Sequence, residues 1–342
     1  MHRLTTVLMG CLALLQVMPA RAAGNLSWEQ WQTVPGVFDV TGSMPDGTLL
    51  VATEKGLVGL RPNTGALFPA RSDLPVPDPG VENYVAYSSG LAVAGAGCSF
   101  PTPALYAIRT SPPSVLRVDL VTGSSSTLAP IAGVDTLNGI AFDRSGRFGN
   151  RLLVIGPHSG QTVVDAVDCN GRVSLVTDSA PRMEGGMEVA PPTFGAFGGD
   201  LIAPDEYSGA LLAVTPEGTT QIVTHNNLPS GGDIGAESAG FVPPGFSKGG
   251  AAYLADRATA NNAHVGTDTL LRLTADQLLA AGVAEGDLLV ANEGAGTTVA
   301  IRCAADGSCT EVLRIGQASD AAHIEGHLLL VATTPAPSPS PL

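Results

Sequence analysis

The chain has 342 residues with 42 glycines and 26 prolines, a formal net charge of −14, and charged residues at 14% of its length. An acidic chain with few lysines and arginines lacks the cationic face that nucleic acids and anionic membrane surfaces require, so we exclude both as partners. Frequent glycine and proline with few charges favour a β-rich protein with many turns over a helical one.

The first residues have the pattern of a secretory signal peptide. Arg3 gives a positive start, Val7–Val17 is apolar, and Ala20–Ala22 is an A-x-A cleavage site. We therefore predict a signal peptide over residues 1–22 and a protein secreted to the periplasm or the extracellular space. No later run approaches the roughly 18 apolar residues of a membrane helix.

Short apolar runs separated by turn residues predict strands along the rest of the chain. In chain order they are Phe38–Val40, Thr48–Ala52, Leu57–Leu60, Val81–Tyr87, Val115–Asp119, Ser126–Ala129, Ile140–Phe142, Leu152–Ile155, Thr162–Val167, Val173–Thr177, Leu211–Thr215, Thr220–Thr224, Asp287–Ala291, Thr298–Arg302, Thr310–Ile315 and His327–Ala332. One helix is predicted over Thr274–Ala281, with Thr274 as N-cap and Gly282 as its stop. Cys98–Pro113 and Ala258–Asp268 are expected to be irregular insertions, and residues 333–342 form a proline-rich tail outside the fold.

Three segments repeat the same pattern of strand, glycine-containing turn and strand. They are Leu137–Val154, Met183–Ala203 and Glu237–Leu254, spaced by about 50 residues, which suits one blade of a β-propeller. We predict an all-β, six-bladed propeller over residues 24–332 as a single domain, with Gly24–Val34 forming a strand or a short helix that seals the end of the ring. Seven blades remain possible because the final strands are hard to allocate.

Polar residues recur where the repeats begin, and we expect them at the starts of strands. They are Asp39, Glu82, Asn138, Glu184, Glu237 and Asp287. The first strand of each propeller blade lines the central channel, so Glu82, Asn138, Glu184 and Glu237 could converge there. Calcium takes six to eight oxygen ligands of this kind. The alternative is that each residue caps its strand by hydrogen bonds to the backbone.

Two of these positions lie in motifs that resemble a known family. L-N-G-I-A-F-D-R-S-G, which contains Asn138, and M-E-G-G-M-E-V-A, which contains Glu184, resemble segments of the gluconolactonase and regucalcin-like six-bladed propellers. The resemblance implies that Asn138 and Glu184 bind a divalent metal that polarises a lactone carbonyl and activates water. The family's first glutamate ligand, in G-E-G-P, is replaced here by Gly36–Asp39.

The resulting hypothesis is a metal-dependent lactone or ester hydrolase acting on a small molecule. Its metal ligands are Glu82, Asn138 and Glu184, and its catalytic base is Glu184 or Glu237. Calcium is the first candidate metal and zinc the alternative. The competing hypothesis is a non-catalytic propeller that binds a small ligand or a protein partner through its loops. In either case we expect a monomer.

Four cysteines follow the signal segment, and an exported protein can oxidise them. Three pairings are possible. We favour Cys303 with Cys309, which bracket a tight hairpin, and therefore Cys98 with Cys169. Free buried thiols are the alternative.

Two further patterns suggest chemistry. H-I-E-G-H over His323–His327 places two histidines and Glu325 at alternating positions, which suits a transition metal or, alternatively, hydrogen-bonded residues at a blade end. Ala236–Gly240 imitates the nucleophile turn of an esterase, but its first glycine is missing, so Ser238 is not expected to act as a nucleophile.

Overall fold

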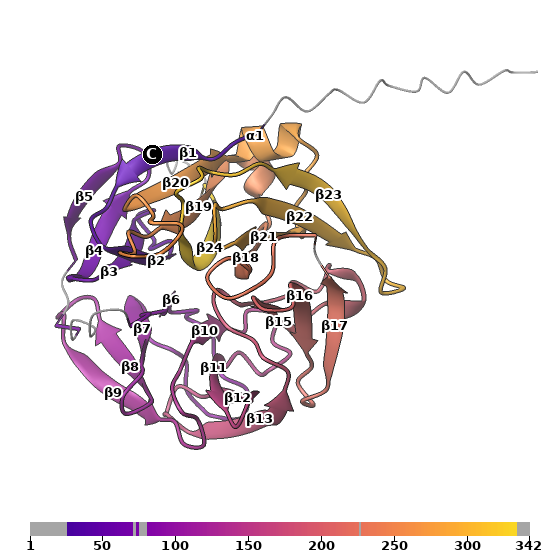
Figure 1. Cartoon of the computed structure of the whole chain (residues 1–342). Coiled ribbons are helices and arrows are strands. Elements are labelled where there is room, and N and C mark those ends of the chain that lie inside the picture. Colours follow the sequence, from indigo (N-terminus) through magenta and orange to yellow (C-terminus); the bar gives the residue numbers. More distant parts are fainter. Residues whose placement is uncertain (1–25, 71–72, 75–80, 226, 334–342) are drawn as a thin grey trace, which may run out of the picture.

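The computed structural model describes residues 26–70, 73–74, 81–225 and 227–333. The predicted signal peptide lies outside the described residues, as does the predicted tail beyond Thr333. Within them, six four-stranded antiparallel sheets surround a central channel (Figure 1). The fold is the predicted six-bladed β-propeller.

The first four blades follow the chain, each running from an inner strand at the channel to an outer strand. Blade 1 consists of β2 (Val37–Thr41), β3 (Leu49–Thr53), β4 (Gly56–Arg61) and β5 (Ala66–Pro69). Blade 2 consists of β6 (Val85–Tyr87), β7 (Ala104–Arg109), β8 (Ser114–Asp119) and β9 (Ser125–Pro130). Blade 3 consists of β10 (Gly139–Phe142), β11 (Leu152–His158), β12 (Gln161–Val167) and β13 (Val173–Ala180). Blade 4 consists of β14 (Glu188–Val189), β15 (Leu201–Asp205), β16 (Ala210–Val214) and β17 (Thr220–His225).

The last two blades exchange strands. Blade 5 consists of β18 (Ala236–Phe241), β21 (Leu288–Asn292), β22 (Thr298–Cys303) and β23 (Cys309–Ile315). Blade 6 consists of β24 (Ile324–Ala332), β19 (Gly250–Asp256), β20 (Thr269–Thr274) and β1 (Glu29–Thr33). After β18 the chain therefore forms the middle of blade 6, returns to complete blade 5, and finally supplies the inner strand of blade 6.

This exchange corrects two predictions. The next three strands after Asp287 (β21, β22 and β23) belong to blade 5, not to the last blade, and Asp287 precedes a second strand instead of starting an inner one. Both carboxylate oxygens of Asp287 accept hydrogen bonds from the Arg302 guanidinium at 2.7 Å. The repeat spacing could not reveal the exchange, because it assumes that four consecutive strands make one blade.

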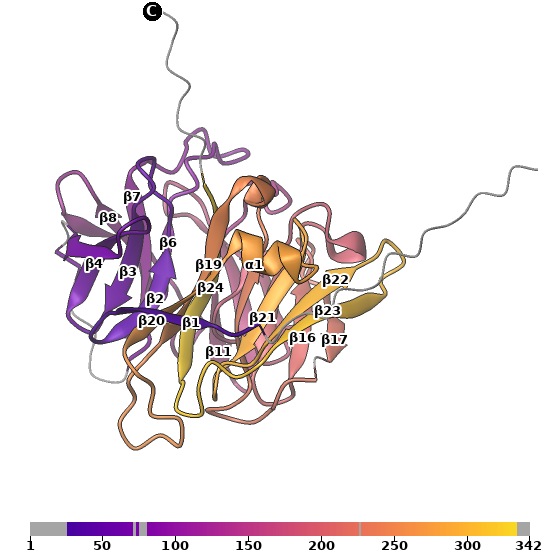
Figure 2. The same cartoon turned by 90° about the horizontal axis from the view of Figure 1, so that it is seen from above.

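The two ends of the described chain close the ring within one sheet. β1 pairs with β20 at the outer edge of blade 6, while β24 forms its inner edge (Figures 1 and 2). Trp28, just before β1, is buried, and its indole Nε1 donates to Thr298 Oγ1 in blade 5 at 2.9 Å. The predicted sealing segment is thus a strand.

Apolar side chains fill the spaces between neighbouring blades. Every residue of β2, β3, β6, β10 and β18 is buried, because both faces of an inner sheet region pack against other blades. Phe100, Tyr106 and Phe142 pack edge to face between blades 2 and 3, with ring centroids 4.8 to 5.3 Å apart. The rigid blades fix the positions of side chains at the ends of the inner strands.

Local features agree with the sequence in three places. Helix α1 (Ala275–Ala280) begins with a capping box between Thr274 and Gln277. The structure contains both favoured disulfides: Cys303–Cys309 closes the β22–β23 hairpin, and Cys98–Cys169 joins blades 2 and 3. Ala258–Asp268 contains no strand.

One local prediction was wrong. Cys98–Pro113 is not wholly irregular, since A-L-Y-A-I-R within it forms β7. This strand is buried on both faces, so it lacks the alternation of a half-exposed strand, and the prolines on either side of it obscured it.

Candidate cation site in the channel

Acidic side chains from several blades meet at the channel end where the inner strands begin. Glu82, Glu237 and Glu325, from blades 2, 5 and 6, each offer a carboxylate oxygen, and these atoms all lie within 4.8 Å of one another. Glu237 and Glu325 are 5% and 2% exposed, whereas Glu82 is half-buried. Carboxylates from three separate blades therefore lie next to one another in the channel.

The hydroxyl of Tyr84 contacts two of these three carboxylates. It donates to Glu237 Oε1 at 2.6 Å and lies 3.3 Å from Glu82 Oε2. Burial, followed by the charge of Glu325, raises the pKa of Glu82 to about 8. Burial and the charges of Glu325 and Glu82 hold the pKa of Glu237 well above its usual range. Carboxylates that face one another away from water resist ionisation unless a cation joins them.

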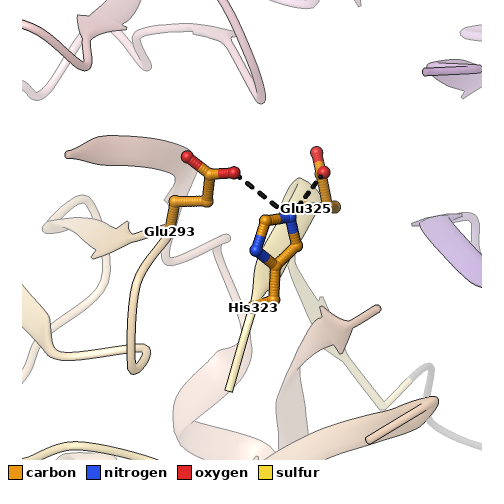
Figure 3. Close-up of side chains that lie close together, drawn as sticks. All are labelled: Glu293, His323 and Glu325. Atoms are coloured by element: carbon orange, nitrogen blue, oxygen red, sulfur yellow. Dashed lines mark hydrogen bonds and ion pairs between the residues drawn. The ribbon is translucent and has the colours of Figure 1, made fainter. Parts of the chain in front are cut away.

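A second group shares Glu325 with the first. His323 Nε2 lies 3.1 Å from Glu325 Oε1 and 3.2 Å from Glu293 Oε1, and Figure 3 shows both carboxylates directed at this nitrogen. Burial, followed by the negative charge of Glu325, raises the pKa of Glu293 to about 10. Arg257 contributes positive charge here, with Nη1 3.2 Å from Glu325 Oε1.

The acidic chain continues towards the surface through Glu206. Glu206, the exposed Asp233 and Glu293 form a third group whose ligand atoms lie within 4.8 Å of one another. The Arg182 guanidinium binds Glu184 and lies 3.1 Å from Glu206 Oε2. Burial, followed by hydrogen bonding to Glu184, raises the pKa of Glu206 to about 7. We refer to Glu82, Glu206, Glu237, Glu293 and Glu325 as the carboxylate cluster.

Of the four residues expected to converge in the channel, Glu82 and Glu237 lie in the carboxylate cluster. Glu184 sits at its edge, bound by Arg182. Asn138 is in the neighbouring channel wall, where its backbone oxygen accepts from Gly185 N at 3.2 Å. Its side-chain oxygen Oδ1 is buried and has no hydrogen-bond partner among the described residues. An unpartnered acceptor of this kind suits a cation or a water molecule.

Steric crowding explains why the M-E-G-G motif has glycine at both positions. Gly185 has a φ of +77°, and a Cβ there would collide with the Glu237 carboxylate. A Cβ on Gly186 would meet the backbone oxygen of Gly326 on β24. These two glycines allow blades 4, 5 and 6 to approach one another at the channel, which positions Glu237.

The side chains of the H-I-E-G-H segment lie in two different places. Glu325 belongs to the carboxylate cluster and His323 contacts it. Gly326, however, has a φ of +72° and lies in a bulge of β24 that ends the alternation. His327 therefore points elsewhere: its Nδ1 lies 3.0 and 2.9 Å from the two carboxylate oxygens of Asp39, and its Nε2 lies 2.8 Å from the backbone oxygen of Ile140. The three side chains do not form one metal site.

Sequence reasoning missed Glu206 and Glu293. Glu293 directly follows β21 and Glu206 directly follows β15, which are second strands of their blades, and no repeat position distinguishes them. Ser238, by contrast, behaves as expected. It is fully buried, and its hydroxyl donates to the backbone oxygen of Gly326 at 2.6 Å, which ties it to the structure.

Fold and site together define a six-bladed β-propeller with a carboxylate-lined channel. None of the helices in the described part of the chain is long and apolar enough to cross a lipid bilayer. A scan against protein-family models finds no match, and a search of curated proteins finds none either.

Solved structures that match this chain include enzymes and binding proteins. Virginiamycin B lyase from Staphylococcus aureus is 12% identical over 81% of this chain and 83% of its own, with a TM-score of 0.42. The calcium-binding protein regucalcin from Agrobacterium tumefaciens is 15% identical over 69% and 74%, with a TM-score of 0.40. A protein assigned as a gluconolactonase is 16% identical over 67% and 71%, with a TM-score of 0.37. The two groups that the sequence motifs resemble are thus among the structural neighbours.

Proposed function

We propose that the protein binds a divalent cation in its channel and uses it to hydrolyse a lactone or ester. The observation that carries this proposal is the meeting of Glu82, Glu237 and Glu325 from three blades within 4.8 Å. Their donor chemistry fits a hard cation, because carboxylate oxygens are the ligands that calcium prefers. Calcium is our first candidate, and the nearby imidazole of His323 keeps zinc as the alternative.

Bound there, the cation would supply Lewis acidity towards the substrate carbonyl and towards water. The protein's own residues have separate roles. Glu237 is the residue that we assign as proton acceptor, since Tyr84 fixes the orientation of its Oε1. Glu184 is held by Arg182, so we assign it to shaping the site instead of to proton transfer. Asn138 offers its free Oδ1 as a further oxygen ligand.

A panel of lactones and esters tests this function in the presence of calcium, zinc or manganese. We expect cation-dependent turnover that chelation abolishes and that Glu237→Gln lowers at least 100-fold, a loss typical of removing a general base. Glu217→Gln changes an exposed turn residue and should retain full activity. Absence of cation-dependent turnover in the parent, or equal turnover in the Glu237 variant, contradicts the proposal.

A second candidate is a non-catalytic propeller in which the cation stabilises the ring and the function is binding of a ligand or a protein. The deep burial of Glu237 and Glu325 favours it, because a structural ion needs no access for substrate. Cation-dependent thermal stabilisation without turnover would select this candidate. We further propose that the chain is exported, in keeping with its two disulfides.

A further inference from the structure

The opposite end of the channel contains a large cavity that the carboxylate cluster does not use. It has a volume of about 840 Å³ and is lined by residues at or beyond the ends of the inner strands, among them Thr41, Tyr87, Phe142, Val189 and Phe241. The carboxylate cluster lies where inner strands begin. The volume is within the range of small-molecule sites in proteins.

The floor of the cavity separates it from the cation site. His327 lines the cavity, and its ring stands edge-on to the ring of Tyr84 with centroids 6.0 Å apart. Tyr84 in turn places its hydroxyl 2.6 Å from Glu237 on the other side. Both nitrogens of His327 are already held by Asp39 and Ile140. The two ends of the channel are therefore distinct sites stacked along its axis.

The wall is mainly apolar, with a small number of polar groups. Apolar lining residues come from every blade and include Val40, Val85, Phe142, Val189, Phe241 and Leu329. Such a wall favours a ligand with an apolar body, because burying apolar surface away from water stabilises the complex. The polar groups then set which ligand fits.

Two polar side chains of the cavity, those of Arg144 and Tyr87, have hydrogen-bond donors that find no partner within the described structure. Arg144 is exposed and makes one hydrogen bond within the described structure, from Nη2 to the backbone oxygen of Tyr87 at 3.2 Å. The side chain of Tyr87 is 7% exposed, and its hydroxyl has no partner among the described residues. The carboxylate in the wall, Glu188, accepts from Phe241 N at 2.7 Å, and its charge acts on Arg144. The remaining donors of the guanidinium and the phenol hydroxyl are therefore available to a ligand in the cavity.

We propose that this cavity binds a small molecule that carries an apolar body and a carboxylate, with Arg144 as the partner of the carboxylate. A guanidinium fork matches the two oxygens of a carboxylate, and its other donors are available for that contact. This binding activity goes beyond the proposed hydrolysis and does not depend on it, because the cation site lies on the other side of Tyr84.

Titration calorimetry with decanoate, below its aggregation concentration, tests the proposal on the full chain. We expect the parent to bind decanoate, and Arg144→Met to bind it at least about tenfold more weakly, as loss of a charged hydrogen bond predicts. Arg144→Lys should recover part of the affinity. Arg172→Met, which changes an exposed arginine on the β12–β13 turn, should bind like the parent.

Two further probes make the test specific. Decyltrimethylammonium has a similar apolar chain with a positive head, and we expect it not to bind. Ser89→Trp places a large ring at a residue that lines the cavity and should weaken decanoate binding. Chelation should leave decanoate binding unchanged, which separates this site from the proposed function. No binding to the parent, equal binding to Arg144→Met, or equal binding of the cationic probe overturns the proposal.

Discussion

The Asp39–His327 pair and the carboxylate cluster line the same channel, yet they differ in how their charges are satisfied. Asp39 is fully buried and accepts from the backbone N–H groups of Val40, Val85 and His327, each at 2.8 Å, in addition to the His327 ring. The carboxylate cluster has five carboxylates and few donors. A satisfied buried charge stabilises a fold, whereas an unsatisfied group of like charges prepares a place for a ligand.

The largest expected effect follows from breaking the satisfied pair. Asp39→Asn removes the charge opposite the imidazolium of His327 and places an amide among groups that all donate. Breaking a buried ion pair from one side costs about 3 to 5 kcal/mol. Chemical denaturation should show this loss with calcium and with chelator alike. A loss below about 1 kcal/mol would mean that the pair does not anchor blades 1 and 6 as we describe.

Neutralising a member of the carboxylate cluster should instead stabilise the cation-free protein. Glu237→Gln removes one of three facing carboxylates, so we expect the chelator-treated protein to melt at a higher temperature than the parent. The same variant should lose the stabilisation by cation, which for the parent is about 2.7 kcal/mol at a cation concentration 100-fold above Kd. Thermal melts measure both quantities.

Glu217→Gln is the matched control for this experiment and should behave like the parent under both conditions. A Glu237→Gln protein that melts lower than the parent in chelator, and still gains stability from calcium, would show that Glu237 has a structural role instead.

The contrast between the two regions explains how far the sequence could predict this molecule. Repeat spacing predicted six blades, and local geometry predicted the capping of α1 by Thr274 and the Cys303–Cys309 disulfide of a tight hairpin. Cys98–Cys169, with a sequence separation of 71, was predicted only as the remaining pair. Glu82 and Glu237 were placed at the channel because each begins an inner strand. Glu293 and Glu206 could not be found, since they reach the site from second strands that no local signal marks.

Blade allocation failed for a related reason. The exchange of β19 and β20 into blade 6 joins strands that are distant in sequence, and the alternation of side chains in one blade resembles that in the next. Gly326 likewise interrupts H-I-E-G-H, and the bulge around it, not the spacing of the residues, decides that His327 joins Asp39.

The pH dependence of stability should also distinguish the two regions. Burial raises the pKa values of Glu206, Glu82 and Glu293 to about 7, 8 and 10, above the ordinary 4.5. The folded state then holds protons that the unfolded chain has released, so the free energy of unfolding should fall as pH rises from about 5 to 10. Denaturation of chelator-treated protein across this range measures the slope. Calcium should flatten it, and an equal slope with calcium would contradict the assignment.

His327 should titrate differently. Burial lowers its pKa, but the carboxylate of Asp39 and the carbonyl of Ile140 outweigh burial, so the net direction is upward. Its contribution to stability is complete below the unfolded pKa near 6.5 and is lost as pH rises through the folded pKa. Ring resonances in NMR spectra should show His327 protonated above pH 6.5, and calcium should not shift this titration. A folded-state pKa of His327 below 6.5 would contradict the arrangement in which both ring nitrogens donate, one to Asp39 and the other to the backbone oxygen of Ile140.

The most direct test of the carboxylate cluster as a cation site is a calorimetric titration of calcium into chelator-treated protein near pH 8. Carried out in two buffers with different ionisation enthalpies, it also counts the protons that calcium displaces. We predict saturable binding with net proton release, because raised pKa values mean that some of these carboxylates hold protons before the cation arrives. Glu237→Gln should bind at least tenfold more weakly, and Glu217→Gln should match the parent. Absence of binding, or equal affinity in the parent and the Glu237 variant, would contradict the account.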